Sequence, residues 1–355
     1  MTLRTCRRSR PIWPWRRGAA SAALALLASL LPLAAPAAQA RGSCLEIVLL
    51  EKGGRLTLRA SDGKADLTVA SERSVNAIAK EFLKVYEALD GNQGLDARFD
   101  ARLELLSVEL LGPLRPALRE AACVVFEINP RFLHFALDLL PVDGEPLFLA
   151  KPTAFALSRP SSTAIEDPVV GGPLRGLIVR DPETDPEDGA GEAQRLFPAS
   201  DLLHIEQADP RMFAHADYDF LLISAYGSVT PSWGSAPADE DDVIELGERD
   251  MEADALDGSR FKLVYLDSSQ LGISESFIAS ARRNGVRHFL APLINNEAGN
   301  SSTLMIRYFF GGLSQGRSPM DALFQARRRI HQEFLGRAGR AERLYYAYPF
   351  RLYLL

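Results

Sequence analysis

Two apolar runs in the middle of the chain end in residues whose side chains could take part in chemistry. The first run ends at Tyr226 and Gly227, and the second, further along, ends at Ser268 and Ser269. Both runs have the pattern of core strands in a parallel sheet. In open α/β sheets, ligands bind at the carboxyl ends of neighbouring strands. We therefore expect these four residues to rim a cleft.

The chemistry that this cleft could support depends on a base. A serine hydroxyl stays protonated at neutral pH and needs a general base beside it to act as a nucleophile. Tyr226 is a poor base, because with an ordinary pKa of about 10 only about one tyrosine in a thousand is ionised at pH 7. Base assistance contributes about 10²–10⁴ to a rate. The residue types thus favour a site without catalysis.

A serine-type hydrolase that uses Ser269 or Ser268 is the alternative. His204 or His215 would have to supply the base, with Asp209, Asp217 or Asp219 as a carboxylate to orient it. Asp267 rather than a glycine precedes the two serines, so the G-x-S-x-G nucleophile turn is absent.

No cofactor or metal site is predicted. The five histidines show no i, i+4 pairing that would favour a metal site. Two acidic stretches, 181–189 and 239–242, lack the order of an EF-hand loop. We interpret both as solvated loops, and the second as a surface that could face a basic partner.

Residues 1–40 have the pattern of a secretory signal peptide. Six arginines without an acid precede a run rich in Ala and Leu, and Ala38-Gln39-Ala40 follows as a cleavage site. Pro32 and Pro36 interrupt the run, and it falls short of the roughly 20 apolar residues of a membrane span. We therefore expect an exported bacterial protein, periplasmic or extracellular, whose mature chain has no stable membrane span.

The charge and the cysteines of the mature chain follow from this cleavage. Loss of the six arginines takes the formal net charge from −6 to −12. A chain this acidic is not expected to bind nucleic acid. Cys44 and Cys123 remain, each near the start of an apolar strand. In an oxidising compartment they would form one disulfide, although two buried free thiols fit the sequence equally well.

The 355 residues, 47% of them hydrophobic, are enough to bury a full core. A small N-terminal section, 41–100, is expected to hold a hairpin of strands 45–51 and 55–60 followed by a helix over 74–89. From residue 101 to 355, strands alternate with helices, which predicts a three-layer α/β sandwich with a largely parallel sheet.

This second part resembles the CHAT family, caspase-like cysteine peptidases. The segment Phe132–Leu140 is similar to a Leu-His-x-Leu-Pro-Phe-x-x-Leu motif of that family. The strand Val286–Leu290 and the tail Leu344–Phe350 are similar to its later strands. In the family, His-Gly ends the first of the two central strands and Cys ends the second.

The resemblance implies a caspase-like fold with a degenerate dyad. Tyr226 stands at the histidine position and Ser269 at the cysteine position. The expected function is that of a non-catalytic pseudopeptidase, which binds a protein or peptide partner through the cleft.

Overall fold

The computed structural model describes residues 43–61, 66–90, 97–157, 174–214, 216–229 and 242–355. Residues 1–40 lie outside the described residues, as do His215 and Asp239. The predicted signal peptide therefore stays a prediction. Residues 41–355 form one compact unit.

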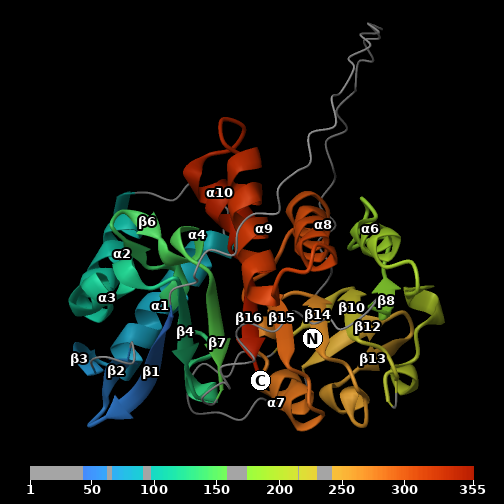
Figure 1. Cartoon of the computed structure of the whole chain (residues 1–355), viewed down its shortest axis with the longest axis horizontal. Helices are drawn as coiled ribbons and strands as arrows, with labels where there is room; N and C mark the ends of the chain where they lie inside the picture. The colour runs from blue at the N-terminus through green and yellow to red at the C-terminus, as the bar shows by residue number, and fades with distance from the viewer. Residues whose placement is uncertain (1–42, 62–65, 91–96, 158–173, 215, 230–241) are drawn as a thin grey trace, which may run out of the picture. The chain divides into compact units, whose positions relative to one another are not determined.

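A mixed sheet of eleven strands runs through this unit (Figure 1). In spatial order its strands are β3 (Asp66–Ser74), β2 (Arg55–Ser61), β1 (Cys44–Lys52), β4 (Cys123–Glu127), β7 (Thr153–Ala156), β16 (Phe350–Leu354), β15 (His288–Pro292), β14 (Leu263–Asp267), β10 (Phe220–Ser224), β8 (Gly176–Arg180) and β9 (Asp201–His204). Neighbouring strands are parallel except at the pairs β2–β3, β1–β2 and β15–β16. The predicted α/β class with a largely parallel sheet is confirmed.

The antiparallel pair in the middle divides the sheet into two groups of opposite direction. β15 and β16 run antiparallel. The carboxyl ends of β8, β9, β10, β14 and β15 therefore share one edge of the sheet, and those of β1, β4, β7 and β16 share the other. Two smaller sheets lie outside it: β11 (Gly227–Ser228), β12 (Val243–Leu246) and β13 (Arg249–Met251), and the pair β5 (Pro141–Val142) and β6 (Glu145–Pro146).

Helices flank the sheet on both faces. They are α1 (Val75–Asp90), α2 (Ala97–Leu110), α3 (Arg115–Glu120), α4 (Leu147–Ala150), α6 (Gly189–Leu196), α7 (Glu275–Arg283), α8 (Asn300–Ser314), α9 (Pro319–Glu333) and α10 (Arg340–Ala347). Figure 1 shows α6, α8 and α9 above the sheet and α7 below it. Phe309 and Phe310 of α8 pack on the ring of Tyr265 in β14, with centroids 5.5 and 5.4 Å apart. This packing fixes α8 over the centre of the sheet.

The N-terminal section is continuous with the main sheet. The predicted hairpin forms β1 and β2, and the predicted helix forms α1. β3 was not predicted, and β1 joins β4 in parallel, with Cys44 directly opposite Cys123. The two cysteines form a disulfide, and their Cα atoms lie 4.5 Å apart. Of the two alternatives that the sequence left open, the structure has the disulfide rather than two free thiols.

The tail differs from the strand that the resemblance implied. Residues 344–347 are the end of helix α10, and the closing strand begins only at Phe350. The helix forms because the side chain of Glu342 accepts a hydrogen bond from the backbone N–H of Gly339 at its amino end. The aromatic residues before Tyr348 therefore belong to a helix rather than to the sheet.

A buried ionic network ties the Phe132–Leu140 segment to the last helices and strand. The Asp138 carboxylate lies 3.4 Å from the Arg327 guanidinium of α9 and 3.8 Å from that of Arg351 in β16. It also accepts a hydrogen bond of 3.0 Å from the Tyr348 hydroxyl. Arg351 in turn donates to the backbone oxygen of Phe135. These contacts hold the Phe132–Leu140 segment against α9 and β16.

Candidate functional site

The two strand ends singled out in the sequence lie side by side. β10 and β14 are parallel neighbours, and Ser224 at the end of β10 is directly opposite Asp267 at the end of β14. All five residues of each strand are buried, as expected for strands that are covered on both faces. The residues that follow therefore leave the sheet together at its carboxyl edge.

Tyr226 and Gly227 form the exposed side of this edge. Tyr226 has 64% of its surface exposed. Its backbone oxygen accepts a hydrogen bond from Glu245, and Gly227 begins β11, the edge strand of the small sheet. A Cβ atom at Gly227 would lie 2.8 Å from the Cβ of Ser268. Glycine is thus required here, because it lets the two chain segments approach closely.

The two serines differ in exposure and in partners. Ser268 is 1% exposed, and its hydroxyl has no hydrogen-bond partner among the described residues. Ser269 is half-buried, and its hydroxyl donates a 3.2 Å hydrogen bond to the side-chain oxygen of Asn296. The nitrogen of the same amide donates to Asp267, at 2.7 Å. Ser269, Asn296 and Asp267 therefore form a relay.

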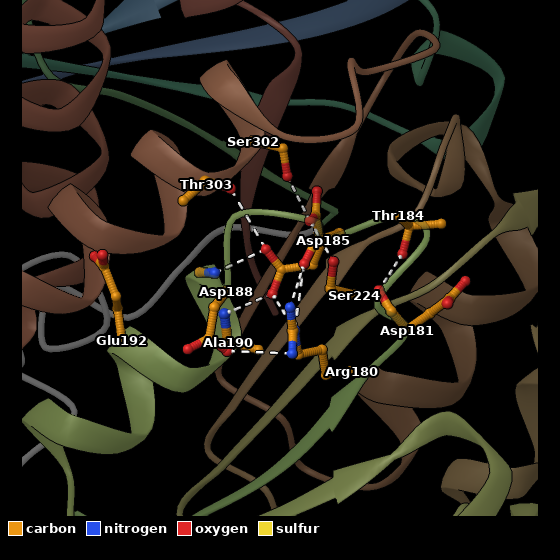
Figure 2. A network of polar contacts seen from close by, with 12 residues as sticks. Arg180, Asp181, Thr184, Asp185, Asp188, Ala190, Glu192, Ser224, Ser302 and Thr303 are labelled. Carbon is orange, nitrogen blue, oxygen red and sulfur yellow. Dashed lines mark hydrogen bonds and ion pairs between the residues drawn. The ribbon is translucent and has the colours of Figure 1, made fainter. Parts of the chain in front are cut away.

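Asp267 is the buried end of this relay. Its other oxygen accepts hydrogen bonds from the hydroxyls of Ser224, at 2.7 Å, and Ser302, at 2.5 Å. Ser302 lies on α8 and Ser224 ends β10, and Figure 2 shows both side chains in one network of polar contacts. Burial raises the pKa of Asp267 to about 6, although the three hydrogen bonds favour the charged form. Both oxygens are occupied by groups other than Ser269.

This relay has the order of a hydrolase triad but lacks a base. In a Ser-His-Asp triad the central imidazole takes the serine proton while the carboxylate orients it. An amide oxygen accepts a hydrogen bond but does not take up a proton near neutral pH. Asn296 can therefore hold the Ser269 hydroxyl in place without activating it.

The described histidines lie away from the serines. The strand registers place His204, Arg180, Ser224 and Asp267 in one row across four neighbouring strands. Strands lie about 4.8 Å apart, so His204 is about 14 Å from the strand that carries the serines. His204 is the last residue of strand β9. His215 lies outside the described residues.

The other three histidines occupy structural positions. His134 packs against the ring of Phe135, and burial lowers its pKa to about 4. His288 is buried at the first position of β15, at the amino end of that strand. His331 lies near the end of α9, where burial also lowers its pKa.

A second buried carboxylate lies beside the site. Asp185 is 1% exposed and accepts hydrogen bonds from the backbone N–H groups of Gly189, at 2.7 Å, and Ala190, at 2.9 Å (Figure 2). It also pairs with Arg180, at 3.2 Å. The prediction that 181–189 is a solvated loop is wrong at this residue, because Asp185 caps α6 from inside. Within the described residues, no group of His, Cys, Asp and Glu could hold a metal ion.

Sequence reasoning found the strand ends but missed Asp267 as a site residue, together with its three hydrogen-bond partners. Ser224 and Asp267 are the last residues of their strands, so the rule that identified Tyr226 and Ser269 could have included them. Asn296 follows β15, and Ser302 lies in the first turn of α8. Their approach to Asp267 depends on the path of the chain between these elements.

Comparisons with known proteins do not identify a family. No protein-family model matches the chain, and no curated protein matches it. None of the described helices has both the length and the apolar character needed to cross a membrane.

Proposed function

We propose that this chain is an exported CHAT-like pseudopeptidase, which binds a protein or peptide at the carboxyl edge of β10 and β14 without cleaving it. The relay from Ser269 through Asn296 to Asp267 carries this proposal. The Ser269 hydroxyl donates its hydrogen bond to an amide oxygen, and an amide cannot take up the serine proton. The proposed site therefore has a hydrogen-bonded serine and, in the part of the chain that the structure describes, no general base to activate it.

The neighbouring small sheet supports the binding part of the proposal. Among the described residues, β11 pairs with β12 alone and is therefore an edge strand of the small sheet. Extended peptides bind such edges by adding a strand, with side chains filling adjacent pockets. The exposed ring of Tyr226 offers stacking area and a hydroxyl at low entropic cost. Export is supported by the disulfide, since such bonds persist in oxidising compartments.

The serine-hydrolase alternative has less support. Of its two candidate bases, His204 lies about 14 Å from the strand that carries the serines, across three strand spacings, and His215 lies outside the described residues. Ser268 is buried and is held against Gly227. Neither observation favours an activated serine.

A peptide library tests binding and cleavage together. We expect fluorogenic extended peptides to remain intact, while a subset of the same peptides binds the immobilised protein. Tyr226→Ala should weaken that binding about tenfold, because an aromatic anchor at an interface contributes about 1–2 kcal/mol or more. Leu335→Ala is the matched control, since Leu335 is also 64% exposed. Equal losses in both variants, or cleavage of any peptide that stops in Ser269→Ala, would contradict the proposal.

A double variant tests the resemblance itself. Tyr226→His with Ser269→Cys would restore the family's dyad. We expect the new thiol to react with iodoacetamide at pH 6 several times faster than the thiol of Ser269→Cys alone, because a neighbouring imidazolium lowers a thiol pKa. Equal rates in the two variants would show that these positions do not form a dyad site.

A further inference from the structure

A basic groove lies on the helix layer. Its walls come from α6, α8 and α9, and it encloses about 470 Å³. Four arginines line it, Arg195, Arg307, Arg317 and Arg329, and Glu192 is the acidic residue of the lining. Asp188 and Glu333 pair with Arg195 and Arg329 from outside the lining, so the four arginines still outnumber the three carboxylates. The chain as a whole has a net charge of −6. Such a local reversal of charge is the pattern of a surface that selects an anionic partner.

The arginines are held in place with donors to spare. Glu192 binds Arg307 through both of its oxygens. The guanidinium of Arg329 lies 4.1 Å from the ring centroid of Tyr308, and its ion pair with Glu333 is long, at 3.8 Å. Each guanidinium carries five N–H donors, and a carboxylate occupies two of them at most. Unused donors therefore remain along the groove.

Arg317 is the least engaged of the four. It is exposed, in the turn between α8 and α9, and within the described residues its guanidinium has no hydrogen-bond or ion-pair partner. Its backbone N–H bonds to Gly312, which fixes its position at the end of α8. A carboxylate that entered the groove could therefore pair with the Arg317 guanidinium without displacing another side chain.

The floor of the groove is apolar and is opened by a glycine. Leu196, Ala326 and Tyr308, whose ring lies against the Arg329 guanidinium, belong to its lining. Gly312 is explained by packing, because a Cβ there would lie 2.9 Å from Ala322. Packing does not explain Gly311, because no atom lies within 4 Å of the position that its Cβ would take. Glycine inside a helix costs about 1 kcal/mol relative to alanine, so its presence at this position is notable.

We propose that this groove is a docking site for an acidic peptide segment of a partner protein. Carboxylates of the segment pair with Arg317 and Arg329, while an apolar side chain lies on the floor beside Gly311. The apolar floor favours a peptide over a free phosphate, which would leave it unused. The net negative charge of the chain disfavours a long polyanion such as nucleic acid. The groove is separate from the strand edge at Tyr226, so the inference does not rest on the function proposed above.

The probe is a fluorescein-labelled pentapeptide, Asp-Glu-Leu-Glu-Asp, titrated with the purified protein by anisotropy at low salt. Its neutral counterpart, Asn-Gln-Leu-Gln-Asn, is the ligand control. We expect saturable binding of the acidic peptide that is at least about tenfold tighter than binding of the neutral one, as for charge-assisted pairs. Arg317→Glu and Arg329→Glu should each weaken it about tenfold or more.

The matched control is Arg328→Glu. Arg328 is the neighbour of Arg329 on α9, is exposed, and lies over Phe324 rather than in the groove. The two substitutions change the net charge equally, so only docking in the groove separates them. Gly311→Leu, which fills the floor without a charge change, should also weaken binding. Urea unfolding of each variant shows whether it is folded.

Four outcomes would overturn the proposal. These are no saturable binding at millimolar peptide, equal losses in Arg328→Glu and Arg329→Glu, no effect of Gly311→Leu, or displacement of the peptide by a short single-stranded oligonucleotide at a lower concentration than by unlabelled peptide. The last outcome would assign the groove to nucleic acid instead.

Discussion

At the scale of single residues, the defining feature of the site is the amide of Asn296, which lies between the Ser269 hydroxyl and the Asp267 carboxylate. Asn296 occupies the place at which a triad has its imidazole, with hydrogen bonds of 3.2 Å to Ser269 and 2.7 Å to Asp267. Three donors surround Asp267 without any full positive charge among them. Its burial therefore has a cost that depends on pH.

The first prediction concerns the titration of Asp267. Burial raises its pKa to about 6, against about 3.9 in an unfolded chain. Between these values the folded protein binds the proton more tightly than the unfolded chain does. The stability that Asp267 contributes is therefore fully present below pH 4 and is lost as the pH rises through 6. Two pKa units correspond to about 3 kcal/mol.

Urea unfolding of the wild type and of Asp267→Asn at pH 4 to 7 measures this contribution. We expect the wild type to lose about 2 kcal/mol of unfolding free energy relative to the variant as the pH rises from 4 to 7. A difference between the two proteins that does not change with pH would show that Asp267 titrates normally.

The same scale shows what could be predicted from the sequence. Tyr226 and Ser269 were found because apolar runs end just before them. Ser224 and Asp267, the last residues of the same strands, were missed, although the same rule could have included them. Asn296 carries no such signal, since the residues after β15 resemble an ordinary polar loop. Its role arises only when the loop packs over the end of β14, which a local pattern does not encode.

At the scale of elements, the errors have separate physical causes. Edge strand β9 has no fully buried residue, so it lacks the apolar run by which the central strands were identified. The tyrosines of α10 have the composition of a strand, but the Glu342 cap starts a helix. The loop 181–189 is rich in acids, yet Asp185 is directed inward to bond the first N–H groups of α6.

A second prediction concerns the pairing of β1 with β4. The disulfide joins residues 79 apart in sequence, and such a cross-link contributes about 4 kcal/mol in the chain-entropy model. We expect Cys44→Ala with Cys123→Ala to lower the unfolding free energy by about that amount. Reductant should lower the unfolding free energy of the wild type by the same amount and should not change that of the double variant. A wild type that does not respond to reductant would mean that the bond contributes little.

A third prediction concerns the buried ionic network. Asp138→Asn leaves the guanidinium groups of Arg327 and Arg351 buried without their carboxylate, which costs about 3–5 kcal/mol. Asp143→Asn is the matched control, since Asp143 pairs with Arg119 on the exposed surface and asparagine tolerates its positive φ. We expect a large shift of the urea midpoint for the first variant and little for the second. Similar shifts would contradict a structural role for the network.

At the scale of the whole molecule, the fold has one long sheet with two opposite carboxyl edges. The alternation of strands and helices predicted the class, and the structure confirms it. The reversal of direction between β15 and β16 was not predicted, because a local sequence pattern contains nothing about the direction of the neighbouring strand. Because of this reversal, the unbroken group of parallel strands around Ser269 has five members, β8, β9, β10, β14 and β15, and the carboxyl end of β4 lies at the opposite edge.

The central claim is that the serine at the end of β14 is held but not activated. A fluorophosphonate probe tests it most directly, because the probe labels only activated serines. It would be applied to the wild type, Ser269→Ala and Ser268→Ala, each shown to be folded by its urea transition. We predict no labelling in any of the three proteins. Labelling of the wild type that disappears in Ser269→Ala or Ser268→Ala would contradict the account and assign a serine nucleophile.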